Sequence, residues 1–284
     1  MESLDKIQES KYKSELYLLL SFLGYFVALL LLIFGVIFQI WALPIVAIIL
    51  AGGSFISQKY FKKRLDKVKN DFLIQVLKPA IEKRFKEGKY NPSNGLDEAF
   101  FEGNKVLPLH DLFRSRHLIR GLISKYPFKA SYVRIEELTE KFKRLERNVI
   151  FEGKAIDIEF ALPFKYDNEC LHPKDYSRKT RKKRLEPVEF YQDYMVDGIE
   201  ENKVKEMYSV EVFEAITELI KKHRHVAIHF YYNHMVVLIN DGKDLVNISN
   251  GKQINEDIYN EIHELFTDIE SLVRAIEQSK SMFA

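Results

Sequence analysis

The sequence contains a single cysteine, Cys170, in 284 residues. One thiol cannot form an intrachain disulfide, which excludes the class of small secreted domains held by disulfides and agrees with a reducing compartment. Nothing beside Cys170 resembles an activating signature, so we expect a loop or core position for it. Twelve glycines and eight prolines are also too few for a collagen-like or low-complexity chain.

Charge is absent from one long stretch of the chain. No Asp, Glu, Lys or Arg occurs from Leu16 to Ser57, although 30% of all residues are charged. A membrane-spanning helix needs about 20 apolar residues, and this stretch is about twice that long. We therefore expect it to cross a membrane and to turn back.

The turn is predicted from the few residues that interrupt the apolar stretch. Gln39, Trp41 and Pro44 combine a polar side chain, an interfacial aromatic ring and a helix breaker. The sequence therefore predicts a hairpin of two transmembrane helices, at about 16–38 and 42–57.

Basic residues flank both predicted spans, whereas the turn carries no charge. By the positive-inside rule, this places both termini in the cytoplasm and the protein in the cytoplasmic membrane as a multi-pass protein. The cluster after the second span is also expected to contact anionic lipid headgroups. Its members are Lys59, Lys62, Lys63, Arg64, Lys67 and Lys69.

The predicted spans contain no ionisable group and few strongly polar residues, namely Ser21, Gln39 and Ser54. Ion and proton pathways usually carry intramembrane charges, so a transporter or pump is disfavoured. Small residues at a spacing of four favour close packing of the two helices. These pairs are Gly24 with Ala28 and Ala47 with Ala51.

The remainder of the chain predicts an α+β fold. We expect a membrane anchor at 1–58, an amphipathic helix and loop at 59–95, a mixed domain at 96–250 and a C-terminal helix at 251–284. Apolar residues at helical spacing continue to about Lys86, interrupted by Pro79, and the glycine, proline and asparagine of 88–95 indicate a loop.

The predicted domain begins with a short helix and continues with strands. Apolar residues alternate with a period of two and predict strands of an antiparallel meander, broken by a charged segment at 136–147. The pattern further indicates a short helix at 189–194, a longer one at 211–222 and a hairpin around Asn233. The expected helix and meander strands are 96–101, 118–124, 128–135 and 149–164.

The C-terminal helix carries apolar residues at alternating spacings of four and three, which is typical of a coiled-coil seam. Two interpretations stay open: the helix docks on its own chain, or it associates with a second copy. The seam consists of Ile258, Ile262, Leu265, Ile269, Leu272 and Ile276.

Several segments together resemble the bacterial domain-of-unknown-function family 3137 over about 60–246. They read KYNPSNGLDEAFF, LPLHDLF, HLIRGLI, NVIFEGKAIDIEFALPF, EPVEFYQDYMVDG, YSVEVFEAITELI and VAIHFYYNHMVVLI. The most specific signals are Phe151 with Gly153, and Glu189 with Phe190 and Tyr194. The resemblance implies a membrane-anchored cytoplasmic domain without an established activity. It supplies no catalytic residues, and segment 117–120 departs from the acidic pair that members often carry.

Five of the eight histidines lie between 223 and 263. His225, His229 and His234 fall on a predicted hairpin and are weak candidates for a metal site. Strand positions four residues apart are separated by about 13 Å, which is too far for two ligands of one zinc ion. We therefore expect no bound metal and no other cofactor. The segment HELFT places Thr267 where a metalloprotease helix needs its second histidine.

A nuclease-type set of charged residues follows in the strand at 149–164. Glu152 and Lys154 form an E-x-K pattern, and Asp157 and Glu159 come soon after. Such groups could hold a divalent metal, although carboxylates on a strand are usually solvated. Phosphate-binding glycine patterns, the G-x-S-x-G motif and C-x-x-C pairs do not occur in the chain.

The segment Ser177–Arg184 has six basic residues in eight. A solvated loop is the ordinary outcome, with anionic lipid as the next alternative. Nucleic acid is disfavoured because aromatic residues do not interleave with the bases.

These features favour a non-enzymatic, membrane-anchored interaction or scaffold module with a protein partner at the cytoplasmic face. Self-association is the second partnership that we expect. One alternative is an effector whose hairpins oligomerise to perturb the bilayer on a cytoplasmic signal. Another is a metal-dependent hydrolase or nuclease.

Overall fold

The computed structural model describes residues 2–104, 110–141, 144–166, 169–174, 188–223, 225–246, 248 and 257–284. The chain divides into two compact units. One comprises 1–77 with 248–258, and the other comprises 78–247 with 259–284. The C-terminal helix, which the sequence suggested as a segment of its own, thus belongs from Tyr259 onward to the same unit as the sheet.

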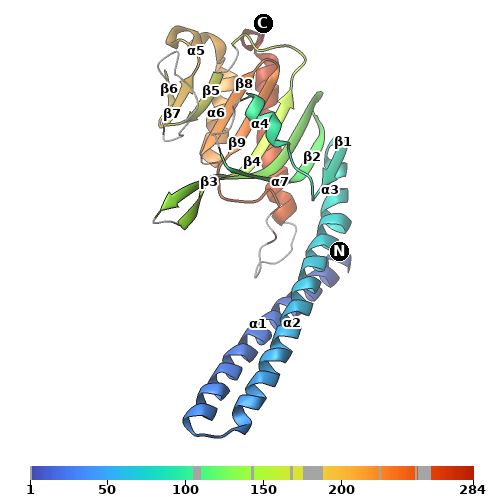
Figure 1. Ribbon diagram of the computed structural model, residues 1–284. Coiled ribbons are helices and arrows are strands. Elements are labelled where there is room, and N and C mark those ends of the chain that lie inside the picture. The colour runs from blue at the N-terminus through green and yellow to red at the C-terminus, as the bar shows by residue number, and fades with distance from the viewer. Residues whose placement is uncertain are drawn as a thin grey trace. The chain divides into compact units, whose positions relative to one another are not determined.

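The first unit is a helical hairpin (Figure 1). Helix α1 spans Glu2–Ile37 and helix α2 spans Ala42–Phe72. Both helices are longer than the predicted spans, because they continue through the charged flanks. The turn lies where it was predicted: Ile40 N–H donates to the Gly35 carbonyl over 3.0 Å, and Gln39 has a positive φ of 53°.

A π-helical turn, η1, follows α2 at Leu73–Leu77, and the short helix α3 covers Lys78–Arg84. Pro79 lies in the first turn of α3, where its missing N–H is tolerated. The interruption predicted at Pro79 therefore occurs one turn earlier, as a widened turn and not as a break in the helix.

The second unit is α+β and contains one nine-stranded sheet of order β1-β2-β3-β4-β9-β8-β5-β7-β6. All recorded pairs are antiparallel. The strands are β1 (Lys86–Asn91), β2 (Leu112–Ile123), β3 (Tyr126–Lys141), β4 (Arg144–Glu159), β5 (Glu169–Pro173), β6 (Val188–Tyr191), β7 (Tyr194–Asp197), β8 (Val226–Tyr231) and β9 (His234–Ile239).

Strands β2 to β4 form the predicted antiparallel meander, and β8 and β9 form the predicted hairpin. Two boundaries were wrong. The segment 88–95, expected as a loop, contributes part of β1 through pairs such as Tyr90 with Ile119. The charged segment 136–147 does not separate two strands: it forms the far ends of β3 and β4, which pair from Lys141–Arg144 to Phe128–Ile158.

The expected short helix at 189–194 is also wrong. This segment contributes to the hairpin of β6 and β7, whose two-residue turn is Gln192–Asp193. Gln192 has a φ of 50°, as a tight hairpin turn requires. The bulky, partly apolar side chains of VEFY and YMVD suit strands better than a helix.

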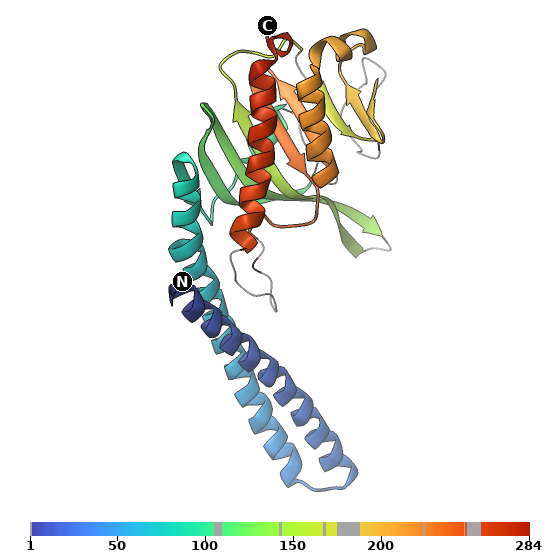
Figure 2. The ribbon, with the colours of Figure 1, turned by 180° about the vertical axis from the view of Figure 1, so that it is seen from behind.

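Helices lie on both faces of the sheet. Helices α6 (Val210–Lys222) and α7 (Asp257–Gln278) cover one face (Figure 2). Helix α4 (Glu98–Asn104) lies on the other face (Figure 1). Helix α5 (Glu201–Met207) precedes α6, and a short 3-10 turn, η2 (Lys280–Met282), follows α7.

Each sheet face has its own apolar core. On the α7 side, the Phe266 ring lies 4.7 Å from the ring of Phe85 and 5.2 Å from that of Phe128. On the α4 side, buried residues from the helix, from the segment before it and from five strands form one cluster: Leu96, Phe101, Leu118, Val133, Ile135, Phe151, Ala155, Ala227, Val236 and Leu238. The sheet is thus the middle layer of the second unit.

Candidate functional site: the apolar hairpin

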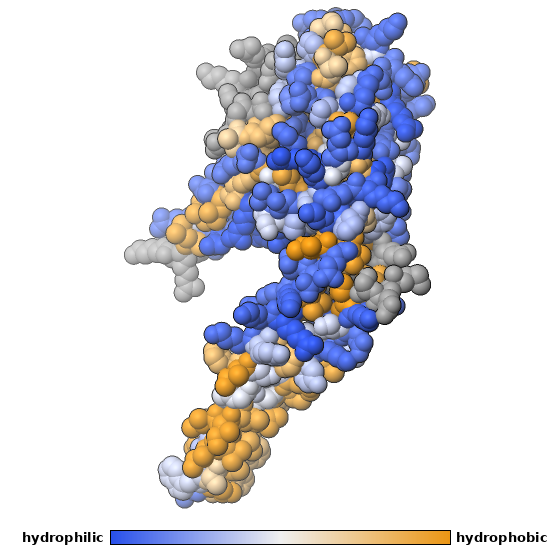
Figure 3. Space-filling model, turned by 90° about the vertical axis from the view of Figure 1, so that its right-hand side faces the viewer, coloured by the Kyte–Doolittle hydropathy of each residue, from blue (hydrophilic) through white to orange (hydrophobic). Residues whose placement is uncertain are grey.

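Two helices, Leu4–Ile37 and Ala42–Arg84, are long and apolar enough to cross a membrane. Their most apolar windows are only 17% and 11% buried. Large side chains such as Leu23, Ile33 and Ile48 are exposed, and Figure 3 shows the hydrophobic residues of the hairpin as a continuous surface. Helices satisfy their backbone hydrogen bonds internally, so lipid is a suitable solvent for such a surface. The hairpin is therefore the candidate site for membrane association.

The seam between α1 and α2 is polar and closely packed. Ser21 Oγ lies 2.8 Å from Ser57 Oγ and 2.8 Å from the Tyr17 carbonyl oxygen. A Cβ atom on Gly24 would lie 2.2 Å from Ser54 Oγ, so a larger residue there would force the Ser54 hydroxyl to move, whereas glycine leaves room for it. Interhelical hydrogen bonds and small residues of this kind hold helices together in lipid.

The polar residues of the spans lie inside the hairpin and not along its outer surface. Ser21 and Ser54 are buried, as are Ala28 and Ala47 from the two small-residue pairs. Gln39 lies in the exposed turn. A membrane-perturbing pore needs a wettable stripe, and these positions do not form one on the outside of the hairpin.

The predicted lipid-contact residues all lie on α2, directly after the apolar part. Lys69 is half-buried and the other members are exposed: Lys59, Lys62, Lys63, Arg64 and Lys67. Among the described residues, these exposed members form no ion pair. On α1, by contrast, Lys13 lies 2.5 Å from Glu9 and Lys11 lies 2.9 Å from Glu15. These five exposed cations of α2 are thus available to an external anion.

The histidines that were considered as metal ligands lie at three different positions of the β8–β9 hairpin. His225 lies before β8 with a φ of 58°, His229 is buried in β8, and His234 Nδ1 lies 2.9 Å from Asp157 Oδ1. The described part of the chain contains no group of three His, Cys, Asp or Glu side chains that could hold a metal ion. His225, His229 and His234 therefore belong to no such group.

The nuclease-type residues of β4 lie on opposite faces of the sheet. Glu152 Oε1 accepts a hydrogen bond from the Tyr132 hydroxyl over 2.7 Å, and Lys154 forms an ion pair with Asp241. Asp157 lies an odd number of positions away, and successive side chains of a strand alternate in direction. The E-x-K pair and the acids after it therefore cannot form one site.

Two polar clusters of the second unit were not predicted. In the first, which is partly buried, Asp157 orients His234. In the other, the Tyr90 hydroxyl lies 2.7 Å from His117 Nδ1, and His117 Nε2 lies 3.6 Å from Asp244 Oδ2. Burial lowers the pKa of His117 and raises that of Tyr90. The imidazole and the phenol are thus held neutral, which suits a structural hydrogen-bond chain better than a nucleophile.

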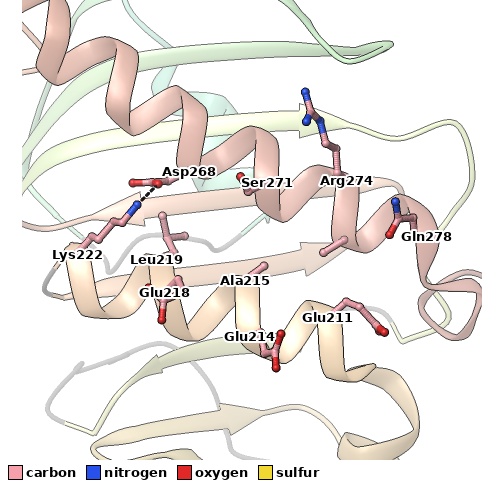
Figure 4. A pocket seen from close by; sticks show the side chains of 11 residues that line it. Glu211, Glu214, Ala215, Glu218, Leu219, Lys222, Asp268, Ser271, Arg274 and Gln278 are labelled. Atoms are coloured by element: carbon pink, nitrogen blue, oxygen red, sulfur yellow. Dashed lines mark hydrogen bonds and ion pairs between the residues drawn. The ribbon is translucent and has the colours of Figure 1, made fainter.

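The groove between α6 and α7 is shown in Figure 4 and has a volume of about 490 Å³. Glu211, Glu214 and Glu218 line it from α6, and Arg274 lines it from α7. At one end, the Lys222 ammonium lies 2.5 Å from the Asp268 carboxylate. These groups are of both signs, and all but the half-buried Asp268 are exposed, which describes a solvated groove between two docked helices.

The six seam residues of the C-terminal helix are all buried. In the structure, the helix is thus docked on its own chain, as the first of the two interpretations expected. Self-association through this seam would require α7 to undock from the chain. Cys170 is buried in β5, as a core position requires. The basic segment Ser177–Arg184 lies outside the described residues.

The chain thus combines an apolar helical hairpin with an α+β unit. No family model matches the sequence, and no curated protein matches it. Among solved structures, the chain is similar to the crystal structure of the mycobacterial trehalose monomycolate transport factor A, TtfA. The TM-score is 0.41 at 8% sequence identity, with 72% of this chain and 96% of that chain covered. This similarity is too low to transfer a function, and the family resemblance stays a prediction.

Proposed function

We propose that the chain is a non-enzymatic, membrane-anchored interaction module. The hairpin of α1 and α2 inserts in the cytoplasmic membrane with both termini inside, and the α+β unit presents a surface to a protein partner. The observation that carries this proposal is the exposed apolar surface of a hairpin whose polar groups are turned inward. Tethering raises the effective concentration of a partner at the same membrane, so modest contacts suffice.

The basic residues of α2 support the proposed orientation. The five exposed members of this set form no ion pair with any described residue, and they follow the apolar segment directly: Lys59, Lys62, Lys63, Arg64 and Lys67. In the proposed topology, they lie at the inner leaflet, where each cation near anionic headgroups contributes about 1 kcal/mol. Trp41, which is 84% exposed in the turn, then lies in the interface on the opposite side.

Membrane insertion is tested by fractionation of cells that express the full chain. We expect the protein to stay in the membrane pellet in alkaline carbonate and to be released by detergent. The double variant Leu23→Arg, Ile48→Arg places two charges on the outer surface of the hairpin, each at a cost of about 3 kcal/mol in the bilayer centre. We expect it to shift into the supernatant or to be degraded.

The control for this experiment is Tyr232→Arg, which changes an exposed aromatic residue of the second unit. It should stay in the pellet. Release of the unmodified protein by carbonate alone, or unchanged retention of the double-arginine variant, would contradict insertion.

Orientation is tested separately by cysteine labelling in intact cells. The natural Cys170 is buried, so an introduced thiol dominates the signal. We expect Trp41→Cys to react with a membrane-impermeant maleimide from outside, and Tyr12→Cys to react only after the cells are opened. The reverse pattern would refute the proposed topology while leaving membrane insertion intact.

A further inference from the structure

Strand β6 lies at one end of the sheet. It pairs with β7 on one side, and in the described part of the chain no strand pairs with its other side. A free edge presents backbone N–H and C=O groups that can accept an added strand. The opposite edge, β1, carries Lys86, Glu87 and Lys89, which is the charged type of edge that resists such pairing. Of the two, β6 is the less charged edge.

A pocket of about 320 Å³ opens between β6 and the helices α5 and α6. The Phe190 ring of β6 lies 5.1 Å from the ring of Tyr208 and 4.9 Å from that of Phe213. Val204 contributes to the wall, and the exposed Val210 lies at the start of α6. The pocket is of the size and apolar character that accommodates a bulky side chain.

The charged residues that line the pocket have one sign. They are Glu189 on β6 and Glu201 at the start of α5, and the described lining contains no cation. Glu201 forms no ion pair with any described residue, whereas Glu189 is already paired with Lys174 over 3.3 Å. An occupant with a positive charge beside an apolar group complements this arrangement.

We propose that a partner protein docks at this place through an extended segment that adds a strand to β6. The segment inserts one large apolar side chain into the pocket and places a basic side chain beside Glu201. Backbone hydrogen bonds along the edge provide affinity, and the pocket provides specificity. This inference rests on the proposed function as an interaction module and names its docking surface and the class of partner.

The probe is an array of synthetic peptides of about eight residues with randomised sequences, applied to the full chain in detergent micelles. We expect bound peptides to share a large aliphatic or aromatic residue next to Lys or Arg. N-methylation of alternate peptide amides should weaken binding about tenfold or more, because each blocked amide removes a ladder hydrogen bond. Binding without a shared pattern, or binding that N-methylation does not affect, would overturn the proposal.

The matched variants change the pocket without changing the fold. Val210→Asp adds a charge at the mouth of the pocket, and the first turn of a helix favours an acidic residue, so the variant should fold. It should lose about tenfold in affinity for the selected peptides. Glu201→Lys should shift the selected pattern from basic toward acidic residues.

The control is Tyr232→Asp, an exposed aromatic position on the β8–β9 turn, which should bind as the unmodified chain does. Equal binding by Val210→Asp and the unmodified chain would place the peptides elsewhere and refute this site. Fractionation tests the membrane anchor separately from peptide binding. A soluble protein that still binds the peptides would contradict the proposed anchored function but not the docking surface.

Discussion

Replacing Gly153 with alanine is expected to destabilise the α+β unit by about 3 kcal/mol or more. A Cβ atom at this position would lie 1.8 Å from the Ile239 carbonyl oxygen and 2.9 Å from its carbonyl carbon. Both atoms are backbone, so no side-chain rotation relieves the overlap, and the strands β4 and β9 would have to separate locally. Such a loss is a large part of the 5–15 kcal/mol that holds a typical domain together.

The measurement is the denaturant midpoint of the full chain in detergent, followed by the far-ultraviolet circular dichroism of the sheet. Lys129→Ala, at an exposed position of the neighbouring strand β3, serves as control and should change stability by less than about 0.5 kcal/mol. An unchanged midpoint for Gly153→Ala would show that the two strands do not approach as described.

The second large effect is expected at Glu169, which is fully buried on β5. Burial raises the pKa of this carboxyl to about 8, and a hydrogen bond from the Tyr208 hydroxyl, 2.5 Å away, partly offsets the increase. In the unfolded chain the same group ionises near pH 4.5. Between these values the folded state retains a proton that the unfolded state has released, so stability falls as the pH rises.

Glu169→Gln removes this titration and keeps a carbonyl oxygen as acceptor for Tyr208. Between pH 4.5 and pH 8, the free energy of unfolding of the unmodified protein should therefore fall by roughly 4 kcal/mol relative to that of the variant. The measurement is a series of denaturant titrations across this range.

Tyr208→Phe provides a second test, because it removes the hydrogen bond that lowers the pKa of Glu169. It should extend the fall in stability to higher pH. If the free energies of unfolding of the unmodified protein and of Glu169→Gln changed with pH in the same way, Glu169 would not be a buried neutral carboxyl.

Local patterns predicted much of the fold. The uncharged stretch, the alternation in β2 to β4 and the hairpin around Asn233 are properties of neighbouring residues, and the structure contains each of these elements. The short strands β1 and β6 were missed because their sequences are polar or mixed. Their pairing partners, such as Ile119 for Tyr90, decide their conformation.

In the candidate site, too, some features follow from neighbouring residues and others from partners that are distant in the sequence. The basic and apolar composition of the hairpin could be read from the sequence, whereas its inward serines required the helix register. The pair of Asp157 and His234 joins residues 77 positions apart, and no local signal connects them. Gly153 is an intermediate case: the resemblance singled it out, but only the backbone of Ile239 explains it.

The pairing of β4 with β9 and the late position of α7 have a consequence for synthesis. The hairpin precedes the sheet in the chain, so it leaves the ribosome before the sheet and can pack through its own serines and small residues. The sheet must wait, because its central partner β9 and the covering helix come from the last quarter of the chain. In the proposed anchored state, the hairpin therefore inserts before the sheet is complete. The nascent domain then forms its core while it is held at the bilayer. There, its exposed strands can diffuse toward other nascent chains in two dimensions only.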